Sequence, residues 1–305
     1  MRVAVAGGTG FVGGAIVAEL ARRGEHVVVL THRPTIARAG LPDDVELRAA
    51  DANGDPTLLD SALASVDALV VALAFPNAPM EDPARGWTYE HVDADGTTAL
   101  VGAARRAGVS RLVYISGAGA AEDAERHWFR AKWRAEQAVA ASGITATIIR
   151  PTWIYGPGDV SLNRFLGFAR WLPVVPLTGP GTQLLAPVFI DDVARLAADS
   201  LREQAAAGRT FELGGPETYT MREIVAIALH VAGKRRAILP APAALLRLGA
   251  RAIQHLPGRM LTPDGVDFVN QPATVDVAPL LAAMPRRLTP LREGLESYLS
   301  SSGAR

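Results

Sequence analysis

The sequence predicts an α/β fold, a doubly wound parallel sheet followed by a smaller, mostly helical C-terminal lobe. Two observations lead to this prediction. Strand-like runs of Val, Ile and Leu alternate with helical patterns as far as about residue 155. Runs that are apolar throughout, rather than at every second position, are typical of strands buried on both faces. After Gly156 the chain first becomes rich in Pro and Gly and later turns mostly helical.

The first half supplies the expected elements of the sheet in a regular order. Predicted strands are "RVAVAG" (2–7), "HVVVLTH" (26–32), "VELRAAD" (45–51), "DALVVALAF" (67–75), "RLVYIS" (111–116) and "TATIIRP" (145–151). Predicted helices are "GFVGGAIVAELARRG" (10–24), "TTALVGAARRAG" (97–108) and "ERHWFRAKWRAEQAV" (125–139), and a glycine ends or follows each of them.

The turn between the first strand and the first helix has the spacing GxxGxxG, with Gly7, Gly10 and Gly13. Glycines at these points allow a tight turn, a close approach of the backbone to a pyrophosphate, and close packing of helix on strand. Free N–H groups of Thr9, Phe11 and Val12 would then face the anion at the positive end of the helix. The turn therefore predicts a Rossmann-type sheet that binds a dinucleotide.

The residues at the end of the second strand indicate whether the dinucleotide is NAD(H) or NADP(H). An acidic residue there would hold the ribose 2′-hydroxyl of NAD, but the sequence reads "VVVLTHRPT". His32 and Arg33 are available instead for a 2′-phosphate, which predicts NADP(H) and leaves NAD(H) open. Asp51, which ends the third strand, is expected either to bond the adenine amino group or to cap the next helix.

The second half is expected to add to the sheet and to build the lobe. "VFIDDVARLAADSL" (188–201) reads as a short strand with a helix, and "TFELGG" (210–215) as a further strand. "YGPGD" (155–159) and "LPVVPLTGPG" (172–181) read as loops, while "MREIVAIALHVAG" (221–233) and "PAALLRLGARAIQHL" (242–256) read as helices. We therefore expect a dinucleotide-binding domain at 1–160, which receives parts of 186–216. A smaller lobe for a substrate or a protein partner, at 161–185 and 217–305, should lie over the carboxyl edge of the sheet.

Composition excludes several classes of function. Lys plus Arg total 31 and Asp plus Glu total 31, so no excess of positive charge indicates nucleic acid or anionic lipid as a partner. The chain has no cysteine, and its six histidines lack metal-ligand spacing, so no metal site is predicted. No run is long and apolar enough to span a membrane, and the glycines at the N-terminus argue against a signal peptide. The expected location is the cytoplasm.

The chain resembles the short-chain dehydrogenase/reductase superfamily in its extended or atypical branch. The motifs that carry this resemblance are "GGTGFVG", "AAD" (49–51), "DALVVALA", "VDADGTTAL", "YISGAG", the helix with Lys132, "IIRPTWIYGPGD" and "FIDDVA". They follow the expected order over about the first two thirds of the chain. The tail, with "FELGGPETYTMREI" and "LTPLREGL", looks most like the group around the accessory nucleotide-binding subunit of respiratory complex I and its bacterial relatives.

The resemblance implies roles for individual residues. Lys132 would bond the nicotinamide ribose and lower the pKa of a tyrosine four residues earlier, which exchanges the proton during hydride transfer. Ser116 would orient the substrate carbonyl. The segment 150–154, with Pro151 and Ile154, would contact the nicotinamide carboxamide, and Leu73 and Ala74 at the end of the fourth strand would line the cofactor.

The sequence departs from this pattern at the catalytic tyrosine, whose position is occupied by Trp128. An indole N–H only donates hydrogen bonds and does not ionise, so Trp128 cannot transfer a proton. His127 and Tyr155 are weak candidates for a substitute acid, and Tyr114 is expected in the core. Trp133 and Trp153 are expected to join an aromatic cluster around Trp128.

Three functions remain open from the sequence. The first is an NADP(H)-dependent oxidoreductase whose proton comes from water or from the substrate. The second is a non-catalytic protein that binds a dinucleotide as a structural element or redox sensor and presents its lobe to another protein. The third is an NAD-dependent sugar epimerase or dehydratase, which the missing tyrosine argues against. The substrate is not predicted.

Overall fold

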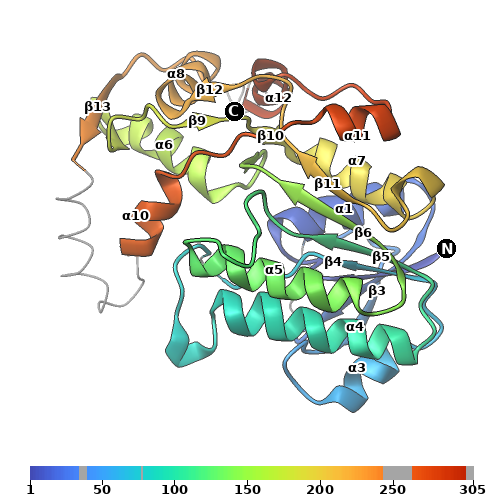
Figure 1. Cartoon of the computed structure of the whole chain (residues 1–305). Coiled ribbons are helices and arrows are strands. Elements are labelled where there is room, and N and C mark those ends of the chain that lie inside the picture. The colour runs from blue at the N-terminus through green and yellow to red at the C-terminus, as the bar shows by residue number, and fades with distance from the viewer. Residues whose placement is uncertain (34–39, 77, 243–262, 300–305) are drawn as a thin grey trace.

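A seven-stranded parallel sheet forms the centre of the structure, a computed structural model that describes residues 1–33, 40–76, 78–242 and 263–299. Its strand order is β11-β6-β5-β4-β1-β2-β3, as expected for a doubly wound sheet (Figure 1). The strands are β1 (Arg2–Ala6), β2 (His26–Thr31), β3 (Glu46–Ala49), β4 (Ala68–Val71), β5 (Arg111–Ile115), β6 (Thr145–Pro151) and β11 (Thr210–Leu213). The predicted fold class is confirmed.

Helices cover both faces of this sheet. One face carries α1 (Phe11–Arg22), α7 (Ile190–Ser200) and α11 (Ala278–Ala283). The other carries α3 (Pro56–Ala62), α4 (Gly96–Arg106) and α5 (His127–Ala140), which stand in front of the sheet in Figure 1. The connections also contain short helical segments, η1 (Pro83–Arg85), η2 (Tyr89–Asp95) and η3 (Gln204–Ala206), of which η2 is a π-helical turn.

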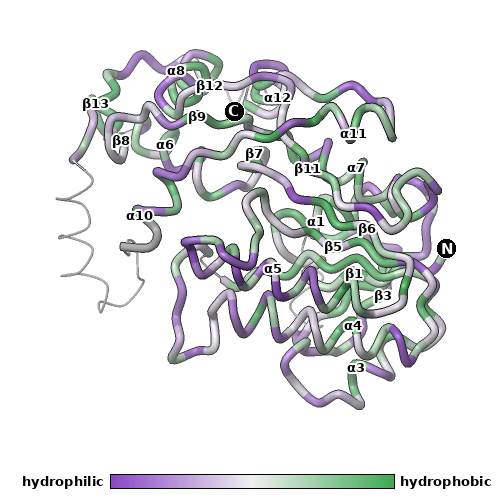
Figure 2. The backbone as a smooth tube through the Cα atoms, in the orientation of Figure 1, coloured by the Kyte–Doolittle hydropathy of each residue, from purple (hydrophilic) through white to green (hydrophobic). Residues whose placement is uncertain are grey.

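The apolar runs in the sequence follow from this two-sided burial. In β1, Val3 and Val5 pack into the core under α1 and α7, whereas Ala4 and Ala6 pack into the core under α3, α4 and α5. All four are essentially inaccessible to solvent. Side chains point alternately to opposite faces, so every position of such a strand must be apolar. Figure 2 shows the result as a hydrophobic sheet between helices of mixed hydropathy.

The strand order reverses at β1. From β1 the chain moves outward to β2 and β3, then returns to place β4 on the other side of β1 and continues to β5 and β6. Connections that leave in opposite directions open a crevice at the carboxyl ends of β1 and β4, where ligands of such sheets bind. The turn with the three glycines lies at this point.

The rest of the chain forms a lobe with its own apolar core. Its elements are β7 (Ile154–Tyr155), α6 (Val160–Trp171), β8 (Val174–Thr178), β9 (Leu184–Leu185), β10 (Val188–Phe189), β12 (Tyr219–Thr220), α8 (Met221–Val231), β13 (Ala237–Ala241), α10 (Pro263–Val269) and α12 (Leu291–Leu299). The helix expected at 221–233 is confirmed as α8, which begins with a complete capping box at Thr220 and Glu223. The helix expected at 242–256 lies almost entirely outside the described residues.

One expectation for the lobe was wrong. The stretch 172–181, read as loops because of its prolines and glycines, contains β8, which pairs in parallel with β13 some 60 residues later. Val175 and Leu177 point into the lobe core, and Pro176 lies on the other face of the strand. This two-stranded ribbon tolerates a proline that a central strand would not.

The glycine turn allows a direct test of the packing of helix on strand. A Cβ at Gly13 would lie 2.1 Å from the Gly7 carbonyl oxygen, whereas a Cβ at Gly14 would meet its nearest neighbour at 3.6 Å. We expect Gly13→Ala to lower the free energy of unfolding by about 1–3 kcal/mol, because helix and strand must separate. Gly14→Ala should be neutral or stabilise by about 0.5–1 kcal/mol. Urea unfolding of both variants tests this, and equal stabilities would contradict the packing argument.

Candidate functional site

The turn before α1 forms a cradle of backbone at the carboxyl edge of the sheet. Gly7 has φ +82°, and a Cβ there would lie 2.1 Å from the Ala72 carbonyl oxygen. Gly10 is the N-cap of α1, and its N–H donates to the Gly7 carbonyl at 2.9 Å. Beyond it, Phe11 and Val12 begin the helix, whose first N–H groups have no partner within the helix. The first turn carries no acidic side chain, so the cradle fits an anion.

The residues expected to bind the adenosine half of the cofactor, and the two expected to line the cofactor after the fourth strand, lie along the same edge. His32 and Arg33 are exposed just beyond β2, and the Arg33 N–H donates to the Thr31 hydroxyl at 3.1 Å. Leu73 is half-buried and Ala74 exposed, both beyond β4, which ends at Val71 and not at these residues.

Asp51 is also exposed at this edge, and its carboxylate accepts the Asn53 N–H at 3.0 Å. It does not cap the following helix, because Asp55 is the N-cap of α3. The capping alternative for Asp51 was therefore wrong.

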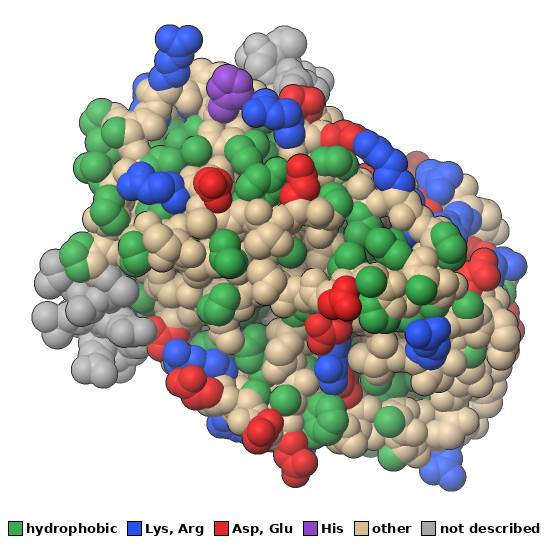
Figure 3. All heavy atoms as spheres, turned by 45° about the horizontal axis from the view of Figure 1, so that its top comes forward, with side chains coloured by type: hydrophobic (Ala, Val, Ile, Leu, Met, Phe, Trp, Pro, Cys, Tyr) green, Lys and Arg blue, Asp and Glu red, His purple; other side chains and the backbone are tan. Residues whose placement is uncertain are grey.

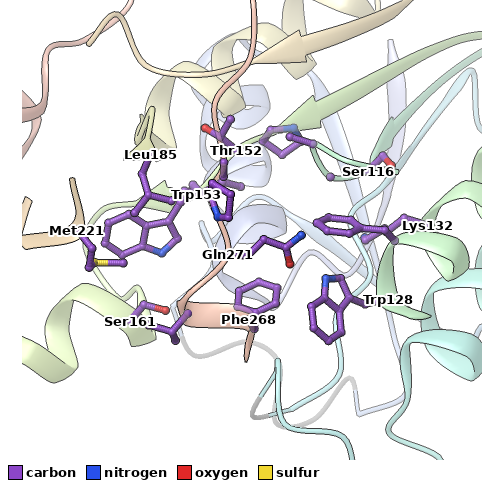
Figure 4. Close-up of a pocket in the computed structure, with 18 of the residues that line it drawn as sticks. Ser116, Trp128, Lys132, Thr152, Trp153, Ser161, Leu185, Met221, Phe268 and Gln271 are labelled. Atoms are coloured by element: carbon purple, nitrogen blue, oxygen red, sulfur yellow. The ribbon is translucent and has the colours of Figure 1, made fainter. Parts of the chain in front are cut away.

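A pocket of about 220 Å³ lies between the carboxyl ends of β5 and β6, the start of α5 and the lobe. Figure 4 shows side chains of both parts of the chain facing it, with Ser116, Trp128 and Lys132 on the side of the sheet and Leu185, Met221 and Phe268 on the side of the lobe. Pro151 and Ile154, expected beside the nicotinamide, also line it. As far as the structure describes it, the lining is mostly aromatic and aliphatic and includes no acidic residue.

Lys132 is held by a buried carboxylate. Its ammonium lies 2.5 Å from Asp93, a residue of η2, and 3.3 Å from the Ile115 carbonyl oxygen. The Asp93 side chain is only 3% exposed. Burial raises the pKa of Asp93 above its ordinary value, and the Lys132 charge opposes that rise. The pair is therefore a neutral unit in the wall of the pocket.

Ser116 also has a charged partner. Its hydroxyl donates to the Glu136 carboxylate at 2.5 Å, and Arg150 binds both oxygens of that carboxylate at 2.9 and 2.6 Å. Trp128, Lys132 and Glu136 follow one another at intervals of four on α5, which brings all three to one face of the helix. The Ser116 proton is thus directed towards Glu136.

Trp128 belongs to an aromatic cluster and is 3% exposed. Its ring lies 6.3 Å from Tyr89 and 5.7 Å from Phe268, measured between ring centres. Its indole nitrogen is buried without a hydrogen-bond partner in the described part of the chain. Trp153 lines the same pocket, whereas the Trp133 ring packs against the Arg150 guanidinium at 5.9 Å.

The weaker candidates for an acid do not face the pocket. His127 is 42% exposed and its ring nitrogen lies 2.9 Å from Glu81. Tyr155 is completely buried, and its hydroxyl points to the carbonyl oxygens of Pro290 and Leu291, both at 3.4 Å. Burial raises its pKa far above the ordinary value, which further disfavours Tyr155 as an acid. Neither residue lines the pocket, so the structure argues against both; Tyr114 lies in the core, as expected.

Several residues of the site were missed in the sequence. Asp93 and Glu136 are buried partners of predicted residues, and Tyr89, Phe268 and Gln271 line the pocket. Asp93 stands in the quoted motif "VDADGTTAL" among other polar residues, so no local pattern marked it as buried. Phe268 and Gln271 lie more than 130 residues after Trp128, and no sequence pattern connects them with it.

Other kinds of site are absent from the described residues. They contain no group of three or more His, Asp or Glu side chains that could hold a metal ion. Among their helices, none is sufficiently long and apolar to cross a membrane. On the face shown in Figure 3, acidic and basic side chains are interspersed, and neither sign forms a continuous patch.

Comparison with known proteins agrees with a dinucleotide-binding cradle at the carboxyl edge of the sheet. A family model described as NAD(P)H-binding matches residues 7–164, just over half of the chain. The chain belongs to the NAD(P)H-binding family. Solved structures agree on the fold: the UDP-glucose 4-epimerase of Thermus thermophilus, in complex with NAD, has a TM-score of 0.78 at 23% identity over the full length of both chains. An NADPH-dependent quinone oxidoreductase of Escherichia coli, complexed with NADPH, has a TM-score of 0.74 at 22% identity over 97% of this chain and 99% of that one.

Three curated relatives extend the comparison. Subunit 9 of the NADH dehydrogenase [ubiquinone] 1 alpha subcomplex, mitochondrial, from Mus musculus is 29% identical over 72% of this chain and 58% of that protein. The ceramide reductase of Caulobacter vibrioides is 28% identical over 79% of this chain and 73% of that protein. The 2-alkyl-3-oxoalkanoate reductase of Stenotrophomonas maltophilia is 30% identical over 77% of this chain and 77% of that protein. The match thus spans little more than half of the mouse protein. The predicted resemblance to extended short-chain dehydrogenases and to the complex I subunit is confirmed.

The Lys132–Asp93 pair predicts a dependence of stability on pH. Lys132→Met should lower the free energy of unfolding by about 3–5 kcal/mol near neutral pH, because it leaves a buried charge unpaired. The pKa of Asp93 is already raised in the folded state, so the folded state binds this proton more readily than the unfolded one. Stability must therefore fall as the pH rises from the ordinary Asp value through the raised one, and more steeply without Lys132.

Urea unfolding at about pH 5 and about pH 8 measures this difference. The matched control is Lys132→Met combined with Asp93→Asn, which should recover most of the loss and remove the added pH dependence. A single variant as stable as the wild type at both pH values would contradict the buried pair.

Proposed function

We propose that the protein is an NAD(P)H-dependent reductase of an apolar carbonyl compound, with NADP(H) as the preferred cofactor. The observation that carries this proposal is the pocket, which joins Lys132 and Trp128 at the carboxyl edge of the sheet to apolar side chains of the lobe. The described part of its lining offers apolar contacts for a substrate and one cation, Lys132, which is already paired with Asp93. Two relatives with names of reductases, one of them for a 2-alkyl-3-oxoalkanoate, support the same class of reaction.

The residues of the edge fit the cofactor. The turn of Gly7, Gly10 and Gly13 would hold the pyrophosphate against the N-terminus of α1, since side chains at Gly7 and Gly13 would collide with neighbouring backbone. His32 and Arg33 would meet the 2′-phosphate, and Asp51 the adenine. Thr9, Leu73, Ala74, Pro151 and Ile154 complete the proposed contacts. The bound cofactor would supply a hydride to the substrate carbonyl carbon.

The proton for the carbonyl oxygen has to come from elsewhere than Trp128. An indole N–H can donate a hydrogen bond to that oxygen but cannot release its proton. The Ser116 proton is directed to Glu136, and the Lys132 ammonium is bound to Asp93. We therefore propose that water, or an acidic group of the substrate, provides the proton, which makes the reaction slower than that of an enzyme with a positioned acid.

A second function is favoured by the same two contacts, Ser116–Glu136 and Lys132–Asp93, together with the non-ionising ring of Trp128. If Ser116 and Lys132 keep these partners when a dinucleotide is bound, the site binds and does not react. The protein would then use its dinucleotide as a structural element or redox sensor and bind another protein through its lobe. The relative in the NADH dehydrogenase alpha subcomplex is in keeping with this alternative. An epimerase or dehydratase has less support, because it needs the acid–base group that Trp128 replaces.

Cofactor preference can be tested at Arg33. The wild type should bind NADPH more tightly than NADH, and Arg33→Ala should weaken NADPH alone by about ten- to a hundredfold, since a charge-assisted hydrogen bond contributes about 1.5–3 kcal/mol. The matched control is Arg105→Ala, which removes an exposed arginine from the end of α4. Fluorescence titration with both nucleotides gives the constants, and equal affinities in the wild type would refute the assignment.

The role of Trp128 can be tested by restoring the phenol. Oxidation of NADPH with a panel of alkyl ketones should be slow in the wild type. Trp128→Tyr should raise it, at most by the roughly 10²–10⁴-fold that a positioned acid supplies. Trp128→Phe is the control, because it changes the ring without adding a hydroxyl. Equal rates of the two variants would favour the binding function, and fast turnover of the wild type would show another acid at work.

A further inference from the structure

Two polar atoms in the pocket have no hydrogen-bond partner among the residues that the structure describes. They are the indole nitrogen of Trp128 and the amide oxygen of Gln271, both buried and without a hydrogen bond to any described residue. In Figure 4 the Gln271 amide extends into the middle of the pocket. The indole nitrogen of Trp128 lies on the edge of its ring that faces the Gln271 amide. Buried groups of this kind are normally paired, so an unpaired donor and an unpaired acceptor in one pocket indicate a ligand that satisfies both.

The two atoms make complementary demands on that ligand. The indole N–H only donates, and the Gln271 oxygen only accepts. A ketone or an ester would accept from Trp128 and leave Gln271 unpaired. A carboxamide with an N–H, or a carbonyl beside a hydroxyl, offers an acceptor and a donor on neighbouring atoms and would satisfy both.

The charges around the pair favour a neutral ligand. Among the described residues of the lining, Lys132 alone is charged, and Asp93 neutralises it at a distance of 2.5 Å. A carboxylate would place its negative oxygens against the Gln271 oxygen without a free cation to compensate. Phe165, Leu185 and Phe268 line the same pocket with apolar surface. The site thus combines a neutral polar group with hydrocarbon.

We propose that Trp128 and Gln271 together recognise a neutral acceptor–donor group, a carboxamide or a hydroxycarbonyl, on an apolar substrate. This inference rests on the proposed reductase, because the ligand is the substrate of that same pocket. The tryptophan at the tyrosine position is then a recognition residue. Since it stands on α5 and Gln271 follows α10, the ligand bridges the sheet domain and the lobe.

The wild type can be tested without any variant. Calorimetric titration at saturating NADP⁺ compares N-butyl-3-oxobutanamide with its N-methyl derivative, which keeps the acceptor and lacks the N–H donor. We expect the secondary amide to bind at least about tenfold more tightly. The same comparison of 3-hydroxy-2-octanone with 2-octanone tests a hydroxyl donor, and the larger ratio identifies which group the site recognises. Equal affinities within both pairs, or no binding of any probe, would overturn the proposal.

Variants assign the preference to the two residues. Gln271→Met is nearly isosteric and should abolish the preference for ligands that carry the N–H or O–H donor. The affinity for the N-methyl amide should change little. Trp128→Phe should weaken both amides. The control is Gln137→Met on the exposed face of α5, which should leave the ratio intact. A preference that survives Gln271→Met in a folded protein would overturn the assignment.

Oxidation of NADPH with the same four probes separates this inference from the proposed function. Selective binding without turnover would refute the reductase and leave the recognition pair standing. Turnover of the probes without selective binding would support the reductase and refute the recognition pair.

Discussion

The contact between Gly7 and Gly13 is the constraint on which the rest of the structure depends. No side chain fits at either position, since a Cβ on each would lie 2.1 Å from a backbone oxygen. The contact fixes α1 against β1 and places the helix N-terminus at the point where the strand order reverses. It thereby sets where an anion can bind, and β4, β5 and β6 then place the pocket at a defined position along the same edge.

The face of α5 that borders the pocket is occupied by internal contacts. Trp128 carries no ionisable group, the buried Asp93 binds Lys132, and Glu136 binds both Ser116 and Arg150. Each contact lies at the edge of an apolar pocket, where a charge without a partner would be costly. The arrangement suits a site that selects and holds its ligand.

The sequence predicts the sheet better than the site, for a physical reason. Strands buried on both faces and glycines at points of close approach leave local patterns, and β1 to β6 with α1, α4, α5 and α8 could be predicted from them. The ribbon of β8 and β13 depends on pairing across some 60 residues, and its prolines favoured a loop. Burial of Tyr155 under α12, and the approach of Gln271 to Trp128, likewise depend on tertiary contacts that no local period encodes.

The position of Tyr155 has a consequence for the order of assembly during synthesis. A Cβ at Gly294 would lie 2.2 Å from the Tyr155 hydroxyl, so α12 fits over this ring only through a glycine. Six strands of the sheet and the glycine cradle are complete by Pro151, whereas the last wall of the pocket comes from residues around 268–273. On the ribosome, therefore, we expect the nascent chain to be able to hold a nucleotide well before it can enclose a substrate.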